Sequence, residues 1–446
     1  MGAPGDPTTV DPQPLDEPEG CAPLRARGRA RVSSAGTRSG QEVRVKITDI
    51  TVVPFKTHAD RFRNGQALPR TELLQTVTCI QTDEGVAGCY FGGGGHGDQD
   101  GLPADAREHL EGRIKPMLVG QDPLDREKFW KWMWVANVPE PVVGVVDMAL
   151  WDLAGRAAGL PVAKLLGGAR DRVKAYASTY PNVGSPEDYA QHALECRRQG
   201  YTAYKIHPHY FWDPATRRAA PGRPSHVDWD IATCRAVRAA VGDGMVLMYD
   251  PWGTYHTLEE ALRVGRELER LDFSWYEHPM PEYRVESYVR LARELRIPIL
   301  SPEIAAGHVF TRADWILRGA SDMSRMDANR GGITAARKTA IVCEAYGIKC
   351  EIHMSGFGNL QVLGATSEDT SEYYEKGLLA PGVDYDAPLP YLHRTCDPLD
   401  ADGYVTLPRG PGLGYDIRWD YIAANTVGDA RLPAGIAAEA RPAPPA

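Results

Sequence analysis

From about residue 172 onward the chain alternates short apolar runs with amphipathic helices, and this pattern constrains the fold more than any other feature of the sequence. The alternation is typical of βα units, whose strands lie parallel in one sheet. The runs, in chain order, are VKAYAST, AYKIH, MVLMYD, FSWYEH, IPILSPE, MSRMD and IKCEIH. The helices between them include 185–199, 228–241, 257–270, 285–296 and 334–346.

The number of runs selects one arrangement of the parallel sheet. Seven runs, with an eighth strand expected near SEYYE, predict an α/β fold of the (β/α)8 type, a modified TIM barrel, rather than a doubly wound sheet. No G-x-G-x-x-G follows any run, so a dinucleotide-binding fold lacks its fingerprint.

The residues before the barrel follow a different pattern, with strands first and helices later. VRVKITDITVVPF alternates apolar and polar residues, as a half-buried strand does. ELLQTVTCIQTDEGVAGCYF predicts a hairpin with its turn at 83–85, and GVVDMALWDLAGRAAGL predicts an amphipathic helix. This segment is expected to form a small α+β domain.

Composition excludes several classes of protein. The net charge of −9 argues against a nucleic-acid partner, and no apolar run approaches the about 18 residues of a membrane span. Residues 1–41 contain no apolar signal region and are expected to form a disordered leader. The eight cysteines are scattered without a C-x-x-C, which indicates reduced thiols and a cytoplasmic protein.

An ionisable residue closes each of five consecutive apolar runs. These residues are spaced 27, 26, 24 and 26 apart, one βα unit each. In order they are Asp250, Glu277, Glu303, Asp327 and His353. Because the C-terminal strand ends of a barrel meet at one mouth, we expect the first three carboxylates to lie together. Three like charges there require a cation, and all-oxygen ligation suits Mg²⁺.

The run AYKIH adds Lys205 and His207, two residues apart. On a strand both side chains point to the same side, so they are expected to lie next to each other at the strand end. Two like charges at that distance would lower the pKa of the lysine toward the range of a base. An ordinary strand exit with two solvated polar residues is the alternative.

At this point the chain resembles a known family, the enolase superfamily, and within it the mandelate racemase subgroup. The resemblance covers about residues 43–420, a capping domain plus a barrel. Its motifs here are GVVDMALWDLAGRAAGLPVAKLLGG, MYDPWG, YEHP, SPE, RMDANRGGIT and EIHMSG. The resemblance implies an α+β capping domain 42–165, a catalytic barrel 166–400 and a C-terminal segment 401–425 that packs back on the capping domain. Composition predicts the leader 1–41 and a flexible tail 426–446.

The resemblance also implies roles for the strand-end residues. Mg²⁺ would be held by Asp250, Glu277 and Glu303 and would stabilise the enediolate formed when a proton α to a carboxylate is removed. Lys205 and His207 would stand on one face of the substrate.

His353 would stand on the opposite face of the substrate, oriented by Asp327.

The chain departs from the family pattern at the second strand. Members with two functional lysines read K-x-K, whereas this chain reads Lys205-Ile-His207. We expect His207 to replace the second lysine as base, with Lys205 as an electrostatic partner near the substrate carboxylate. In the alternative, His207 is a spectator and the Asp327–His353 pair does all the acid–base work.

Further substrate contacts are expected from the eighth strand and from loops. Near SEYYEKG, Glu372 is preferred over Glu375 as the acidic residue that contacts the substrate. The long connection 209–230 is expected to cover the site or to contact a neighbouring subunit. Residues 57–70 and the Gly-rich segment 88–98 are expected to act as specificity loops of the capping domain.

The expected reaction is dehydration of a sugar acid to a 2-keto-3-deoxy acid through an enediolate. The sixth strand ends in Asp327 rather than the Lys of the muconate-lactonising subgroup, which disfavours cycloisomerisation. A racemase or epimerase of a 2-hydroxy acid is the alternative, and a non-catalytic ligand-binding protein is a third. The expected partner is a small carboxylate, and the resemblance implies a homo-oligomer.

Overall fold

The computed structural model describes residues 45–63, 66–93, 101–208, 212–213, 218–219 and 227–439. The described residues belong to one compact unit. The leader predicted for 1–41 lies outside the described residues, as do residues 94–98 of the Gly-rich segment and most of the 209–230 connection.

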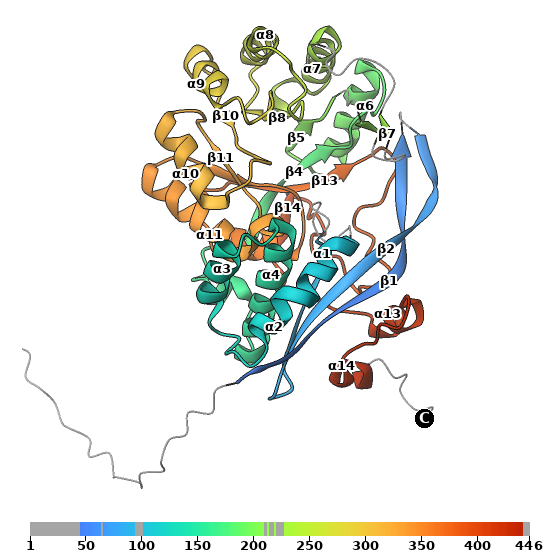
Figure 1. Ribbon diagram of the computed structural model, residues 1–446. Coiled ribbons are helices and arrows are strands. Elements are labelled where there is room, and N and C mark those ends of the chain that lie inside the picture. Colours follow the sequence, from blue (N-terminus) through green and yellow to red (C-terminus); the bar gives the residue numbers. More distant parts are fainter. Residues whose placement is uncertain are drawn as a thin grey trace, which may run out of the picture. The chain divides into compact units, whose positions relative to one another are not determined.

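A three-stranded antiparallel sheet opens the described chain (Figure 1). Its strands, in spatial order, are β1 (Ile47–Arg63), β2 (Gln66–Thr82) and β3 (Ala87–Phe91). The predicted turn joins β2 to β3, and Gly85 there has a φ of 79°, which favours glycine. The described part of the segment 57–70 belongs to β1 and β2, which continue as a paired hairpin as far as Arg63 and Gln66. Its role in specificity stays a prediction.

Helices follow the sheet and pack against it. They are α1 (Ala104–His109), η2 (Leu110–Ile114), α2 (Lys115–Leu118), α3 (Arg126–Val135), α4 (Glu140–Ala158) and α5 (Val162–Leu165). Helix α4 contains the predicted amphipathic segment and lies on β3. The close approach of α4 to β3 requires a glycine at position 88, because a Cβ on Gly88 would come within 2.2 Å of the Ala149 carbonyl oxygen.

Eight parallel strands form the second part of the unit. They are β4 (Arg172–Thr179), β5 (Ala203–Ile206), β8 (Val246–Tyr249), β9 (Tyr276–Glu277), β10 (Ile299–Leu300), β11 (Ser324–Met326), β12 (Cys350–Ile352) and β13 (Tyr373–Leu379). They pair in chain order from β4 to β10, and β11 pairs with β12.

Three contacts close the cycle of strands. A bridge between Leu300 and Met323 joins β10 to the start of β11, and Cys350 N–H donates to the Thr370 carbonyl before β13. Strand β13 pairs in parallel with β4. This topology confirms the predicted (β/α)8 barrel and the predicted eighth strand.

Helices connect successive barrel strands. They are α6 (Pro186–Arg198), α7 (Val227–Val241), α8 (Leu258–Arg270), α9 (Val285–Glu294), α10 (His308–Arg318), α11 (Ala328–Tyr346) and α12 (Phe357–Gly364), with the short 3-10 helix η3 (Gly242–Gly244) after α7. Capping boxes at Ser185 and Thr257 start α6 and α8. Within the 209–230 connection, the short strands β6 (Trp212–Asp213) and β7 (Arg218–Ala219) pair with each other.

The chain beyond the barrel returns to both earlier parts. Strand β14 (Tyr404–Thr406) pairs antiparallel with β4, and after α13 (Trp419–Asn425) Thr426 bridges Phe55 of β1. The predicted tail contains α14 (Ala434–Glu439), whose Ile436 is buried. The domain boundaries at 165 and 400 remain predictions.

Part of the barrel interior, away from the strand-end residues, is apolar. A separate cluster of buried side chains fills it: Tyr176, Ala203, Met248, Trp275, Leu300, Met323 and Tyr373. Among the described helices, none combines the length and apolar character needed to traverse a bilayer.

Candidate active site

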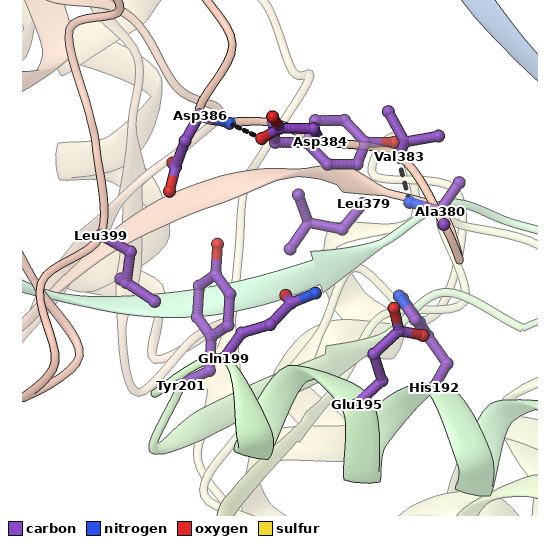
Figure 2. A pocket seen from close by; sticks show the side chains of 12 residues that line it. His192, Glu195, Gln199, Tyr201, Leu379, Ala380, Val383, Asp384, Asp386 and Leu399 are labelled. Carbon is purple, nitrogen blue, oxygen red and sulfur yellow. Dashed lines mark hydrogen bonds between the residues drawn. The ribbon is translucent and has the colours of Figure 1, made fainter.

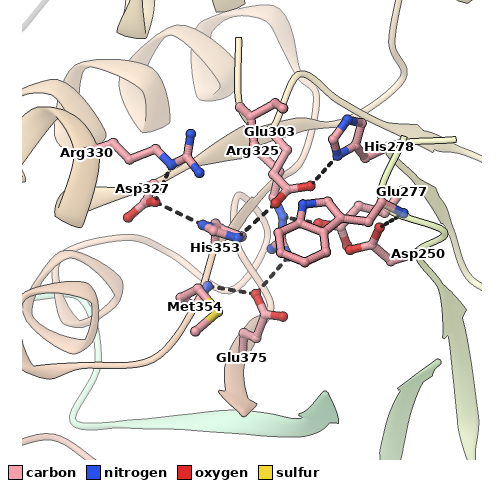
Figure 3. A network of polar contacts seen from close by, with 12 residues as sticks. Asp250, Glu277, His278, Glu303, Arg325, Asp327, Arg330, His353, Met354 and Glu375 are labelled. Atoms are coloured by element: carbon pink, nitrogen blue, oxygen red, sulfur yellow. Dashed lines mark hydrogen bonds and ion pairs between the residues drawn. The ribbon is translucent and has the colours of Figure 1, made fainter. Parts of the chain in front are cut away.

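The predicted strand-end residues gather at one end of the barrel, and Figure 3 shows five of them, Asp250, Glu277, Glu303, Asp327 and His353. Each is at most 9% exposed although each is ionisable. They are Lys205, His207, Asp250, Glu277, Glu303, Asp327 and His353. Burying so many charges costs free energy unless they are paired, and the contacts among them are therefore informative.

Lys205 is held by three carboxylates. Its Nζ lies 2.8 Å from Glu375 Oε1, 3.0 Å from Glu277 Oε2 and 3.4 Å from Asp250 Oδ2. Burial works against the charged ammonium, but Glu277 and Glu375 outweigh it and raise the Lys205 pKa well above its usual range. The expected lowering of this pKa is therefore wrong, and Lys205 is paired with carboxylates in this structure. Its role in the reaction stays a prediction.

His207 is turned toward oxygen atoms rather than toward Lys205. Its Nδ1 lies 2.9 Å from the Thr179 carbonyl oxygen, and its Nε2 lies 2.9 Å from Asp250 Oδ2. Lys205 and His207 thus both contact the same Asp250 oxygen, Oδ2.

Asp327 and His353 form the predicted pair. His353 Nδ1 lies 2.9 Å from Asp327 Oδ2, and its Nε2 lies 2.9 Å from Glu303 Oε1. Asp327 also caps α11 by accepting from Asn329 N–H at 2.7 Å. Burial would lower the His353 pKa, but Glu303 and Asp327 outweigh it and raise it to about 9.

Three buried side chains offer ligand atoms that all lie within 4.8 Å of one another: Asp250, His278 and Glu303. Burial opposes ionisation of both carboxylates, yet their histidine neighbours lower the pKa of Asp250 and lower that of Glu303 well below its usual range. Two ionised carboxylates in a buried site fit a divalent cation. His278 was not predicted, and its Nδ1 lies 2.7 Å from Glu303 Oε2.

The predicted third carboxylate, Glu277, has other contacts in this structure. Its Oε2 faces Lys205, and its Oε1 lies 2.5 Å from Arg325 Nε. Trp275 Nε1–H donates to Oε2 at 3.4 Å. Glu277 and Asp250 both contact Lys205. The Glu277 carboxylate therefore lies next to the group formed by Asp250, His278 and Glu303 but does not belong to it.

A second carboxylate orders the loop that carries Glu303. Glu282, in the loop after β9, accepts from the backbone N–H groups of Glu303, Ile304 (2.9 Å) and Ala305 (2.6 Å). Arg312 donates to the Glu303 carbonyl oxygen at 2.9 Å. The loop conformation is therefore fixed from both sides, although no sequence pattern singled out Glu282.

Glu372 lies apart from the site, and its predicted role is wrong for a geometric reason. It precedes β13, and its carboxylate binds Lys174 and Lys349 at the strand starts, opposite the strand-end residues. Glu375 lies on β13 and binds Lys205. The alternation of β13 was the available signal, because interior Tyr373 places Glu375 on the same face.

Arg325 is a further residue that sequence reasoning missed. It lies in β11 two residues before Asp327, is fully buried, and binds both Glu277 and Glu375. An arginine in the middle of a short buried strand was the signal, because a cation there needs buried anions.

A separate cavity of about 480 Å³ lies between α6 and the loop after β13 (Figure 2). Its lining includes Glu195, Tyr201, Asp384 and Asp386, and none of the predicted site residues.

Two family models match most of the chain. The enolase C-terminal domain-like family matches residues 188–421, and the mandelate racemase / muconate lactonizing enzyme N-terminal domain matches residues 70–167.

Several characterised proteins are similar over most of their length. The L-talarate/galactarate dehydratase of Salmonella typhimurium is 28% identical over 72% of this chain and 79% of its own. The D-galactarolactone cycloisomerase of Agrobacterium fabrum is 29% identical over 83% and 93%. A crystal structure of D-glucarate dehydratase from Agrobacterium tumefaciens, complexed with magnesium, aligns with a TM-score of 0.77 and 37% identity over 86% of this chain and 99% of that one. The chain belongs to the enolase superfamily, in its mandelate racemase subgroup.

Proposed function

We propose that this protein catalyses the Mg²⁺-dependent dehydration of a sugar acid to a 2-keto-3-deoxy acid. The observation that carries the proposal is the pairing of His353 with Asp327 beside the buried carboxylates Asp250 and Glu303. Relatives named as dehydratases of talarate, galactarate and glucarate support the substrate class.

The proposed cation ligands are the carboxylates of Asp250, Glu277 and Glu303, with His278 hydrogen-bonded to Glu303 as the residue that orients it. The cation supplies electrostatic stabilisation of negative charge on the substrate carboxylate. A set of three carboxylates suits Mg²⁺, whereas direct ligation by His278 would favour softer metals.

Proton transfer is assigned to the two histidines. Asp327 holds Nδ1 of His353, which leaves Nε2 as the atom that delivers a proton to the departing 3-hydroxyl. The Thr179 carbonyl oxygen holds Nδ1 of His207, which leaves its Nε2 to accept the proton from the α-carbon. Lys205 contributes a fixed positive charge near the substrate carboxylate.

The same two histidines favour a second candidate, a racemase or epimerase of a 2-hydroxy acid. Such an enzyme needs a proton-carrying group on each face of the substrate, and His207 and His353 could supply them. The two reactions differ in their products: dehydration eliminates water, whereas racemisation returns the proton to the same carbon.

A substrate screen tests the proposal. Mono- and diacid sugars, with the lactone of galactaric acid as an additional candidate, are incubated with enzyme and Mg²⁺, and 2-keto acids are measured. We expect keto acid from at least one sugar acid and none with His353→Asn. Keto acid formation that survives this substitution would contradict the role of His353.

Deuterium incorporation separates the two candidates. Recovered substrate from a reaction in D₂O that carries deuterium at C2, without keto acid, would replace dehydration by racemisation. His207→Gln should abolish the reaction if His207 is the base and leave it largely intact if His207 is a spectator. The protein is also expected to be a homo-oligomer, which sedimentation can measure.

A further inference from the structure

Four buried side chains close a ring of ion pairs inside the barrel. Lys205 binds Glu277 (3.0 Å) and Glu375 (2.8 Å), and Arg325 binds the same two carboxylates (2.5 and 2.8 Å). Each member is at most 1% exposed. We call this set, Lys205, Glu277, Arg325 and Glu375, the charge ring.

The charge ring is one layer of the barrel. Its members come from β5, β9, β11 and β13, which are alternate strands, as expected for a barrel layer. Each lies two residues after a member of the apolar cluster below: Ala203, Trp275, Met323 and Tyr373. Two positive and two negative charges balance, so the layer is neutral, and removing any one member leaves an uncompensated buried charge.

The charge ring also binds the backbone on both sides of His353. Arg325 Nη1–H donates to the carbonyl oxygen of Ile352 at 2.5 Å. Glu375 Oε2 accepts from Met354 N–H at 2.7 Å. The two peptide groups that flank His353 are therefore each held by a ring member, and Met354 has a φ of 63°, which a β-strand would not impose.

We propose that Arg325 is the positioning residue of the active site, which closes the charge ring and fixes the peptide groups on both sides of His353. The proposal rests on the function proposed above for His353, but its contacts do not involve the substrate. Arg325 acts through its contact with the Ile352 carbonyl oxygen and through Glu375, which binds Met354 N–H. Together these contacts set the position of the His353 imidazole relative to Asp327. Misplacing a catalytic group by about 1 Å can reduce the rate by about 100-fold.

Five variants test the proposal: R325M, R325K, E375Q, the double variant R325M/E375Q, and R170M as a matched control. Arg170 is a partly buried arginine that also donates to backbone carbonyl oxygens, those of Leu363, Ser371 and Glu372, but it does not touch the charge ring. For each variant Tm, kcat and KM are measured. The imidazole N–H proton of His353 is followed by proton NMR, with His353→Asn used to assign it.

We expect R325M to lower kcat by about 100-fold while KM changes by less than about 3-fold, because the catalytic group moves and the substrate contacts remain. R325K, which keeps the charge, should recover part of kcat. R170M should lower Tm and leave kcat and the His353 resonance unchanged.

The double variant separates positioning from stability. R325M/E375Q restores neutrality, so its Tm should exceed that of either single variant, but its kcat should stay low because the Ile352 contact is still missing. Recovery of kcat together with Tm would overturn the proposal, as would wild-type kcat in folded R325M.

The proposal can fail separately from the proposed function. If the wild type dehydrates no sugar acid, the proposed function fails, but the His353 resonance still decides whether Arg325 positions the imidazole. Its loss or shift in R325M, with retention in R170M, supports positioning. An unchanged resonance in R325M overturns it whatever the substrate is.

Discussion

The Nδ1 atom of His353 lies 2.9 Å from Asp327 Oδ2, while the other ring nitrogen faces Glu303. The imidazole is therefore anchored at one end and directed into the site at the other.

This anchoring predicts a graded loss of activity. His353→Asn should lower kcat by at least about 100-fold, because the proton donor is gone, and Asp327→Asn should lower it by about 10–100-fold, because the imidazole loses only its orienting charge. Steady-state kinetics on the substrate found in the screen measure both. Equal losses in the two variants would indicate that Asp327 does more than orient.

Magnesium should stabilise the folded protein, and the effect should depend on three carboxylates. At 100 times the dissociation constant the gain is about 2.7 kcal/mol, which raises Tm by several degrees. Asp250→Asn, Glu277→Gln and Glu303→Gln should each abolish this rise, whereas His278→Asn should only reduce it.

Glu375→Gln is the control for the magnesium experiment. Like Glu277→Gln, it breaks the charge ring, but it removes no proposed ligand, so its magnesium-dependent rise in Tm should persist. If Glu277→Gln keeps the rise and His278→Asn loses it, the third ligand is His278.

Glu282 should control metal affinity without touching the metal. Glu282→Ala removes the acceptor of three backbone N–H groups in the loop that carries Glu303, so Mg²⁺ affinity should fall by about 10–100-fold. Calorimetric titration measures the affinity. Glu286→Ala, which removes a well-exposed glutamate of neighbouring α9, should leave it unchanged.

Burial of Glu351 should make stability depend on pH. Desolvation raises its pKa from the usual 4.5 to about 7, although the Glu372 and Tyr373 N–H groups oppose the rise. Between these values the folded state binds more protons than the unfolded state, so the free energy of unfolding falls as pH rises through the window, by roughly 3 kcal/mol in total.

Glu351→Gln removes this titration. Relative to wild type, the variant should therefore become more stable as pH rises from about 4.5 to 7. Asp147, whose pKa burial raises to about 6, titrates in both proteins and cancels in the comparison. Denaturant unfolding at several pH values measures the difference, and a constant difference would contradict the assignment.

The strand ends of the barrel were predictable because each obeyed a simple rule. A short apolar run followed by an ionisable residue recurred at a spacing of one βα unit, so Asp250, Glu303 and His353 could be placed at one mouth without coordinates. The Asp327–His353 contact was implied by the family resemblance, and it agrees with the same rule, since adjacent strands end side by side.

The layer below the mouth was harder to predict, because it depends on which strand residues point inward. Arg325 lies inside an apolar run, and the pattern of that run indicates a buried strand without indicating a buried charge. Glu372 was preferred over Glu375 because its offset from His353 fitted better. That offset does not fix where β13 begins, and a shift of a few residues moves a side chain from one end of the barrel to the other. The ion pairs of Glu277 with Lys205 and Arg325 could not be predicted either, because spacing along the chain does not show which buried side chains come into contact.

Strand β1 is an edge of its sheet, and it is bridged near Phe55 by Thr426, with Val427 N–H donating to the Pro54 carbonyl oxygen at 2.9 Å. Because translation runs from the N-terminal side, β1 leaves the ribosome long before the residues 426 and 427 that contact its edge. An exposed edge strand is prone to pair with other chains. In a nascent chain this edge is therefore open to pairing with another copy until residues 426 and 427 have been made and have folded against it.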